Sequence, residues 1–502
     1  MTDSFSKIDR SRLESLIAEA RTRAGARKAP VLVTMSERLP ATDPLDVLES
    51  LPRIGVAARR LGDGQMYWNC PREGFALAGI GSVATFSPEG PGRFESVDAS
   101  WTALLENAVI DDPSGGAAGV GPVLMGGFAF EPDPRQTEQW DGFSSAHMIV
   151  PRVLFTSVGG KCWRTISLLV DADGKTDISP ESVEELLGAS SAPAPQAREK
   201  LPTPVDGDSD EIAFSDARSA NQWRALVTIA VEEIRVGRFQ KVVLARDVHA
   251  TASHKVDVFA TLGHLRATHR NSFVFSYWRG DSAFVGATPE RLVRLDGREV
   301  RASSLAGTEK RGATPEEDSA LSALLLASQK DRAEHAAVRD SLYKSLSEIS
   351  DDVSAAETPS LLTLAHVHHL HTPVTARLRE GHSLLDVVAR LHPTPAVGGT
   401  PRDAALEFIR DHEQLDRGWY AAPIGWIGRE SGEFAVALRS AVIAGSEATL
   451  FAGCGIVADS DPELEYRESV LKLRPMQSAI SAALEESTPD LSEIGATSDV
   501  SR

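Results

Sequence analysis

The stretch FQKVVLARD, residues 239–247, has the pattern of a buried β-strand with a lysine at its entrance. Val242, Val243 and Leu244 follow one another without a polar interruption, which is typical of a strand inside a sheet. On such a strand Lys241 and Val243 share one face, and Val242 and Leu244 share the other. A charged ammonium is costly among apolar neighbours, so Lys241 is either solvated at a sheet edge or kept there for chemistry.

Two interpretations of Lys241 follow from this position. The first is a lysine that guards a strand end against edge-to-edge pairing. The second is an amine that loses its proton among apolar side chains and can then accept one near neutral pH. A partner acid would favour the second, and Glu290 in the segment SAFVGATPE is a candidate. A glutamate in such a turn is either solvated or stays protonated and donates to a leaving group.

Length and composition indicate a soluble globular protein. The chain has 502 residues, of which 42% are hydrophobic and 25% charged, enough for two domains or one large two-layered domain. No apolar run is long enough to cross a bilayer, and the first thirty or so residues lack the apolar centre of a signal peptide. Cys70, Cys162 and Cys454 lie far apart without CxxC spacing. We therefore expect a cytoplasmic protein without disulfides or a cysteine-bound zinc.

The charge balance restricts the partners. The formal net charge is -19 and the isoelectric point is about 5.2. Nucleic acids and anionic membranes both require clustered lysine and arginine, so we expect neither as a partner. An anionic substrate would have to be attracted by local cations or by a bound metal.

The order of strand-like and helix-like segments predicts an α+β fold with large, mostly antiparallel sheets in two related halves, forming a sandwich core flanked by helices. The segments FALAGIGS and SAFVGATP resemble each other weakly, which indicates the relation between the halves. We predict a sheet-forming N-terminal half (1–187), a proline- and alanine-rich linker (188–213), a catalytic region (214–482) and a disordered tail (483–502).

Carboxylates gather on two predicted helices of the second half. Glu334 and His335 lie on one side of the helix in SQKDRAEHAAVRDSL. In ADSDPELEYRESVLK, with Asp461 as the N-cap, Glu465, Glu468 and Lys472 line one face. Acids near a helix start complement the helix dipole and can be purely structural. Two glutamates from separate helices are also a typical oxygen-rich Mg²⁺ site.

Further segments favour a ligand site less strongly. Gly453 and Gly455 in FAGCGIV allow a close approach to the backbone. In FAVALRSAVI, read as one strand, Arg439 projects over small alanine side chains, or it is an exposed edge arginine. The run AHVHHLH allows a zinc site, but no acidic or cysteine ligands flank it, and ordinary hydrogen-bonded histidines are favoured.

Taken in order, the motifs resemble those of the chorismate-utilising enzymes, a family that includes isochorismate, salicylate, anthranilate and aminodeoxychorismate synthases. The resemblance covers roughly residues 214–478, with weaker signatures in GIGS and GGFAFEP of the first half. The segments that carry it are KVVLAR, GATPE, LAGT, SQKDRAEH, HPTPAVGGTP, RGWYAAPIGW, FAVALR, FAGCGIV and SDPELEYRESVLK.

The resemblance implies a role for individual residues. Lys241 matches a general base that activates water, and Glu290 matches a general acid. Glu334 and Glu468 match Mg²⁺ ligands, with Glu465 as a supporting carboxylate. Positions that match substrate contacts are Gly307, Thr308, Ala396, Arg439, Gly453 and Lys472, and Tyr420 and His369 fall where family members approach the substrate.

The implied reaction is the Mg²⁺-dependent conversion of the small molecule chorismate to isochorismate, by water addition at C2 and loss of the C4 hydroxyl. Ammonia-using relatives usually have glutamine at the position of Lys241, so water is the expected nucleophile. The runner-up is a salicylate synthase, which eliminates pyruvate from isochorismate, and a non-catalytic chorismate-binding relative is a third alternative. The resemblance further implies a monomer that serves menaquinone or siderophore biosynthesis.

Overall fold

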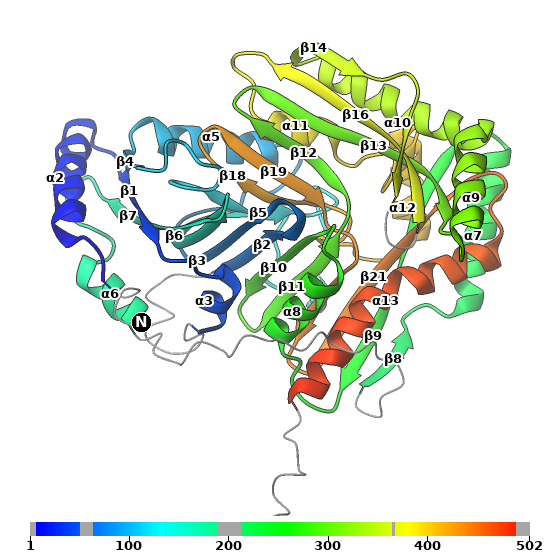
Figure 1. The fold of residues 1–502 in the computed structure, drawn as a ribbon, viewed down its shortest axis with the longest axis horizontal. Coiled ribbons are helices and arrows are strands. Elements are labelled where there is room, and N and C mark those ends of the chain that lie inside the picture. Colours follow the sequence, from blue (N-terminus) through cyan, green and yellow to red (C-terminus); the bar gives the residue numbers. More distant parts are fainter. Residues whose placement is uncertain (1–6, 51–63, 136, 189–211, 364–366, 488–502) are drawn as a thin grey trace, which may run out of the picture.

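The computed structural model describes residues 7–50, 64–135, 137–188, 212–363 and 367–487 (Figure 1). The predicted linker and tail fall mostly on the residues outside these ranges. Within the described ranges, residues 212–213 of the predicted linker begin strand β8, and residues 483–487 of the predicted tail belong to the last helix. The other predicted boundaries, between the N-terminal half and the catalytic region, remain predictions.

The first half contains most of its strands in long antiparallel hairpins. Its elements are α2 (Arg10–Arg27), β1 (Val31–Leu39), α3 (Pro44–Ser50), β2 (Gln65–Cys70), η1 (Pro71–Glu73), β3 (Phe75–Phe86), α5 (Arg93–Glu106), β4 (Val109–Asp111), β5 (Leu124–Phe128), η2 (Glu138–Trp140), β6 (Ala146–Val158), β7 (Lys161–Val170) and α6 (Pro180–Gly188).

The second half alternates strands with longer helices. Its elements are β8 (Ile212–Asp216), α7 (Ala220–Arg235), β9 (Lys241–Ala252), α8 (Val258–Thr268), β10 (Phe273–Arg279), β11 (Ser282–Thr288), β12 (Arg291–Asp296), β13 (Glu299–Lys310), α9 (Pro315–Ala327), α10 (Gln329–Ser347), β14 (Ser350–Ala355), β15 (Ser360–Thr363), β16 (Val367–Leu378), α11 (Leu384–Leu391), β17 (Gly399–Thr400), α12 (Arg402–His412), β18 (Pro423–Ile427), β19 (Ser431–Val436), β20 (Ser440–Ala444), β21 (Glu447–Ile456) and α13 (Pro462–Ser487).

The strands form one continuous hydrogen-bonded network rather than two separate sheets. Followed from β9, the antiparallel neighbours are β9–β21–β20–β11–β10–β2–β3–β6–β5–β18–β19–β12–β13–β16. Strands of the two halves therefore pair directly twice, at β10–β2 and at β18–β5. The α+β fold with large antiparallel sheets is confirmed.

The weak repeat seen in the sequence has a structural counterpart. The hairpin β2–β3 contains FALAGIGS, and the hairpin β10–β11 contains SAFVGATP. The two hairpins pair through their first strands, with Phe275 opposite Trp68, in the order β3–β2–β10–β11. The two similar segments thus occupy equivalent places in two hairpins that pair with each other, which fits the predicted relation between the halves.

Side chains alternate between two apolar layers on either side of the network. Trp68 and Leu77 point into an inner core on one face of the network, whereas Tyr67 and Ala78 point into an outer core on the other face. In Figure 1, α2 covers the outer face at β1 and β7, α8 lies against β10 and β11, and α13 lies along β21. Strands such as β10 carry apolar residues on both faces because one face packs into the inner core and the other into the outer core.

One predicted strand is wrong. The segment FAVALRSAVI is not a single strand, because β19 ends at Val436 and β20 begins at Ser440. Arg439 between them has a φ of 49°, in the left-handed region. Ala435 and Ala441 are therefore in different strands, and the alternation pattern does not apply across the break. Within the described residues, no helix is both long and apolar enough to cross a membrane.

The close approach of β19 to Gly425 of β18 leads to a stability prediction. Gly425 lies opposite Gly126, and a Cβ at Gly425 would lie 2.0 Å from the Glu433 carbonyl oxygen. Since that neighbour is backbone, we expect Gly425→Ala to lower the free energy of unfolding by about 3 kcal/mol. The matched control is Gly25→Ala in α2, where a Cβ meets nothing within 4 Å. It should raise the unfolding free energy by about 0.5–1 kcal/mol, both measured by urea denaturation.

Candidate active site

Lys241 is the first residue of β9 and is half-buried. Its strand pairs with β21, which places Val243 opposite Gly455 and Ala245 opposite Gly453. A Cβ at Gly455 would lie 2.9 Å from Lys241 Cε and 3.4 Å from Nζ. The lysine side chain thus extends across the bare backbone of Gly455 instead of turning away from the sheet.

The two faces of β9 have different surroundings. Val242 and Leu244 pack with Cys454 and Ile456 in an apolar cluster that includes Trp223 of α7. Lys241 and Val243 are on the opposite face, over the glycines of β21. The alternation predicted from FQKVVLARD is confirmed, and it separates an apolar anchoring face from a face that lies beside the bare backbone of two glycines.

Glu290 lies in the connection between β11 and β12 and is half-buried. Its backbone is fixed on both sides, because its N–H donates to Thr288 Oγ1 at 3.3 Å and its carbonyl accepts from Val436 N–H at 3.0 Å. Burial raises the pKa of Glu290 to about 7, although the positive charges of Lys241, Lys472 and Arg439 lower it. The carboxyl group therefore feels the charge of three cationic side chains and still binds a proton with a pKa near neutral pH.

Arg439 is held by the break between β19 and β20. Its carbonyl accepts from Ala287 N–H at 3.1 Å, which ties the arginine to the end of β11 close to Glu290. Burial lowers the pKa of Arg439, and the neighbouring Tyr420, Glu468 and Glu290 oppose this shift. The left-handed backbone, rather than a regular strand, turns this side chain toward the carboxylates.

Tyr420, Gly453 and Lys472 form one corner of the site. A Cβ at Gly453 would lie 3.0 Å from the Tyr420 hydroxyl oxygen, and Lys472 Nζ donates to the Gly453 carbonyl at 2.9 Å. Burial raises the pKa of Tyr420, so its hydroxyl stays protonated and can donate. Any side chain at position 453 would close the space between the strand and the tyrosine.

Gly307 and His369 approach from the other end of the strand network. They lie on the paired strands β13 and β16, where the register shifts between Ala306 and Thr308. Gly307 has a φ of 74° at this bulge. Burial lowers the pKa of His369, the positive charges of Arg439 and Lys472 lower it further, and a hydrogen bond with the Gly307 backbone opposes the shift. Glu290, near Lys241, and His369 of β16 are therefore both influenced by Arg439 and Lys472.

Two of the predicted metal ligands lie together on α13. Glu465 and Glu468 place carboxylate oxygens within 4.8 Å of each other and of Cys454 Sγ. Glu468 pairs with Lys472 Nζ at 2.6 Å, and Glu465 accepts from Ser460 Oγ at 2.8 Å. The two carboxylates fit a hard cation such as Mg²⁺, whereas a sulfur ligand does not. Burial raises the pKa of Cys454 to about 12, so its thiol remains protonated.

Three other predicted residues are placed less fully. Glu334 is on α10 and Thr308 on β13, but the side chains of both lie outside what the structure describes. Ala396 is in the turn before β17, and the Gly398 carbonyl of this turn accepts from Val243 N–H at 3.0 Å. The turn thus lies at the same end of β9 as Lys241.

The histidine run does not form a zinc site among the residues described. His368 Nδ1 and Nε2 contact Thr363 Oγ1 and Asp318 Oδ1, each at 2.9 Å, and His371 Nε2 contacts Ser303 Oγ at 3.2 Å. His369 points into the site instead, and His366 lies outside the described residues. The favoured interpretation of ordinary hydrogen-bonded histidines is confirmed for His368 and His371.

Sequence reasoning missed a buried ion pair beside the site. Glu413 and Arg417 are 1% and 3% exposed and bind each other through both carboxylate oxygens, at 2.6 Å. A glutamate and an arginine four residues apart usually indicate an exposed helix face, so the spacing points away from burial. Only the apolar context of RGWYAAPIGW offers a signal for it.

The site therefore combines a proton-holding carboxyl group, an amine over bare backbone, and cations beside clustered carboxylates.

Residues 17–481 match the family described as chorismate binding enzyme. The chain belongs to this family.

The relatives refine this assignment. The chain is 37% identical over 460 residues to the salicylate biosynthesis isochorismate synthase of Pseudomonas aeruginosa, covering 91% of this chain and 92% of that protein. It is 34% identical over 455 residues to isochorismate synthase MenF of Bacillus subtilis (strain 168), covering 90% of this chain and 93% of that protein.

A solved structure supports the fold. MenF, the menaquinone-specific isochorismate synthase from Escherichia coli, superposes with a TM-score of 0.72 at 24% identity, over 93% of this chain and 99% of that one. Anthranilate synthase component I from Streptococcus pneumoniae superposes with a TM-score of 0.62 at 23% identity, over 80% and 92%. The fold is thus shared by proteins that are named for different activities.

The raised pKa of Glu290 predicts a pH-dependent cost in stability. Between its unfolded pKa of about 4.3 and its folded pKa of about 7, the folded protein holds one proton more than the unfolded chain. Stability therefore falls as the pH rises through this range. Relative to Glu290→Gln, the wild type should lose on the order of 3 kcal/mol of unfolding free energy from about pH 5 to about pH 8.

Urea denaturation at several pH values measures this difference. Parallel stability curves for the wild type and Glu290→Gln over this range would contradict the raised pKa.

Proposed function

We propose that this protein is an isochorismate synthase, which adds water at C2 of chorismate and releases the C4 hydroxyl. The observation that carries the proposal is the juxtaposition of Glu290, whose pKa is about 7, with the amine of Lys241. One group of the pair has to donate a proton while the other accepts one, and the raised pKa of Glu290 suits it to the donating role. The names of the relatives support the same reaction.

In the proposed reaction a neutral Lys241 takes a proton from the attacking water. Glu290 donates its proton to the C4 oxygen, which leaves as a second water molecule while the ring double bonds shift. The burial that holds the proton on Glu290 at neutral pH makes it a competent acid. Lys241 lies over Gly455, so its amine can reach a water above the sheet without displacing a side chain.

The substrate of this reaction is a dianion, and the site is rich in cations although the protein is acidic. Arg439 and Lys472 both lie close enough to lower the pKa values of Glu290 and His369. We assign these two side chains to the carboxylates of chorismate. Tyr420 can donate a hydrogen bond from the same corner, next to Gly453.

Mg²⁺ is part of the proposal. Glu468 and Glu334 would hold the ion, with Glu465 as a supporting carboxylate on the same helix face as Glu468. When bound, the ion withdraws charge from the ring carboxylate and favours addition at C2. Lys472 pairs with Glu468 and would keep that carboxylate oriented.

A salicylate synthase is the second candidate. It is favoured by one observation, namely that a 37% identical relative is named for salicylate biosynthesis. The same Lys241 and Glu290 would form isochorismate first, and pyruvate would then leave. We propose a cytoplasmic monomer as the working form.

A product assay separates the candidates. Purified protein with chorismate and Mg²⁺ should yield isochorismate by chromatography, without fluorescent salicylate or pyruvate. EDTA should abolish conversion, because the carboxylates need the ion to bind the substrate anion. Salicylate and pyruvate in equal amounts would instead establish the second candidate, and intact chorismate would indicate a binding protein without catalysis.

Two substitutions test the role of Lys241. Lys241→Ala should lower kcat by at least about 10²-fold, because general base catalysis contributes on this order. Gly455→Ala should also lower kcat, since its Cβ would lie 2.9 Å from Lys241 Cε and displace the flexible amine. Because that neighbour is the end of a side chain, the melting temperature of Gly455→Ala should change little. Near-normal turnover of Lys241→Ala would contradict the role.

A further inference from the structure

Among the residues that the structure describes, no strand pairs with the middle of β9 on the side away from β21. The short β17 pairs with residues 241–242, and β8 pairs with β9 from Val248 onward. The polar backbone groups between these two stretches need other partners, since an unpaired buried amide or carbonyl is costly.

The buried pair Glu413–Arg417 supplies these partners. Glu413 Oε2 accepts from Ala245 N–H at 2.8 Å, and an Arg417 Nη donates to the Val243 carbonyl at 2.7 Å. One ion pair thus replaces the missing strand over the residues that directly follow Lys241.

The same arginine holds two other segments of the site. Its second Nη donates to the Val397 carbonyl at 2.9 Å, next to Ala396. Its own carbonyl accepts from Tyr420 N–H at 2.8 Å. Three segments that bear site residues, around Lys241, Ala396 and Tyr420, therefore converge on Arg417.

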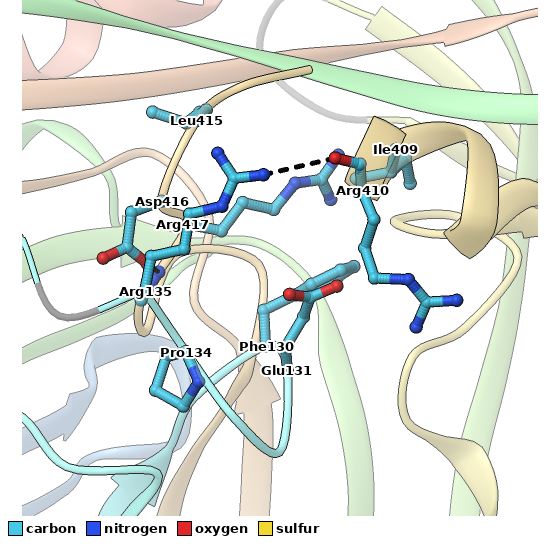
Figure 2. A pocket seen from close by; sticks show the side chains of 10 residues that line it. Phe130, Glu131, Pro134, Arg135, Ile409, Arg410, Leu415, Asp416 and Arg417 are labelled. Atoms are coloured by element: carbon cyan, nitrogen blue, oxygen red, sulfur yellow. Dashed lines mark hydrogen bonds between the residues drawn. The ribbon is translucent and has the colours of Figure 1, made fainter. Parts of the chain in front are cut away.

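The surroundings fix the guanidinium in this orientation. The Phe130 ring lies 4.4 Å from its centre, a cation–π contact. Phe130 and Arg417 also line a small pocket together with Glu131, Arg135 and Arg410 (Figure 2). Since two further arginines lie on that side, Glu413 provides the counter-charge that makes the buried position of Arg417 tolerable.

We infer that Glu413 and Arg417 are positioning residues, which set the place of the Lys241 amine and of the Ala396 and Tyr420 segments relative to one another. The inference deepens the proposed function and rests on it for the turnover measurements alone. Neither side chain needs to touch the substrate for this role, because both act through backbone groups of the three segments.

Arg417→Lys is the first test. Lysine keeps the charge but has no planar fork, so it cannot bind Glu413, Val243 and Val397 at once. We expect kcat to fall about 10²-fold, the loss that a displacement of about 1 Å in a catalytic group produces, with a smaller change in KM. The acylation rate of Lys241 by acetic anhydride, measured by mass spectrometry against exposed Lys255, should rise several-fold.

Glu413→Gln is the second variant and keeps the shape of the side chain. It retains an oxygen for the Ala245 N–H but removes the charge that holds Arg417. It should shift kcat and Lys241 acylation in the same direction as Arg417→Lys, and it decides the question if Arg417→Lys does not fold.

Arg164→Lys is the matched control. Arg164 is 2% exposed, pairs with Glu37 at 2.6 Å and donates to the Lys7 carbonyl at 2.7 Å, all within the first half. It should lower the melting temperature without changing kcat or Lys241 acylation. If Arg417→Lys and Glu413→Gln behave like this control, or if the control reproduces their losses, the inference is overturned. Failure of the wild type to convert chorismate would contradict the proposed function, while acylation would still test the positioning.

Discussion

The register between β9 and β21 is the constraint on which the site depends. It places Gly453 and Gly455 opposite Ala245 and Val243, so that one face of the pair carries almost no side-chain bulk beside Lys241. The other face is anchored by an apolar cluster that includes Val242 and Leu244. Because side chains alternate strictly along a strand, a shift by one residue would bury the lysine and expose the anchor.

The charge near β9 and β21 is opposite in sign to the net charge of the protein. The chain carries a net charge of -19, yet Glu290 is surrounded by Lys241, Lys472 and Arg439. Three cations would normally keep a carboxyl group ionised, and burial outweighs them. The site is thus a small cationic region inside an acidic molecule, which suits an anion that the rest of the surface repels.

The sequence predicted local features well and long-range ones poorly. Alternation identified β9, and the proline-started helix at Asp461 is confirmed by two backbone N–H groups that donate to its carboxylate. The strand break at Arg439 was missed, because a residue with positive φ leaves no trace in an alternation of small apolar residues. The buried pair Glu413–Arg417 was missed since its partners on β9 are more than 160 positions away in the chain, a relation that only the fold creates.

The direct pairing of strands from both halves has a consequence for how the chain can be divided. Two seams, β2 with β10 and β5 with β18, join segments that lie on opposite sides of the connection between α6 and β8. A fragment beginning after that connection would expose both seams as bare strand edges, which recruit other chains. The proposed catalytic residues all lie in the second half, but the two seams tie that half to the first. If a protease cut the connection, the two polypeptides would stay associated through these strand pairings.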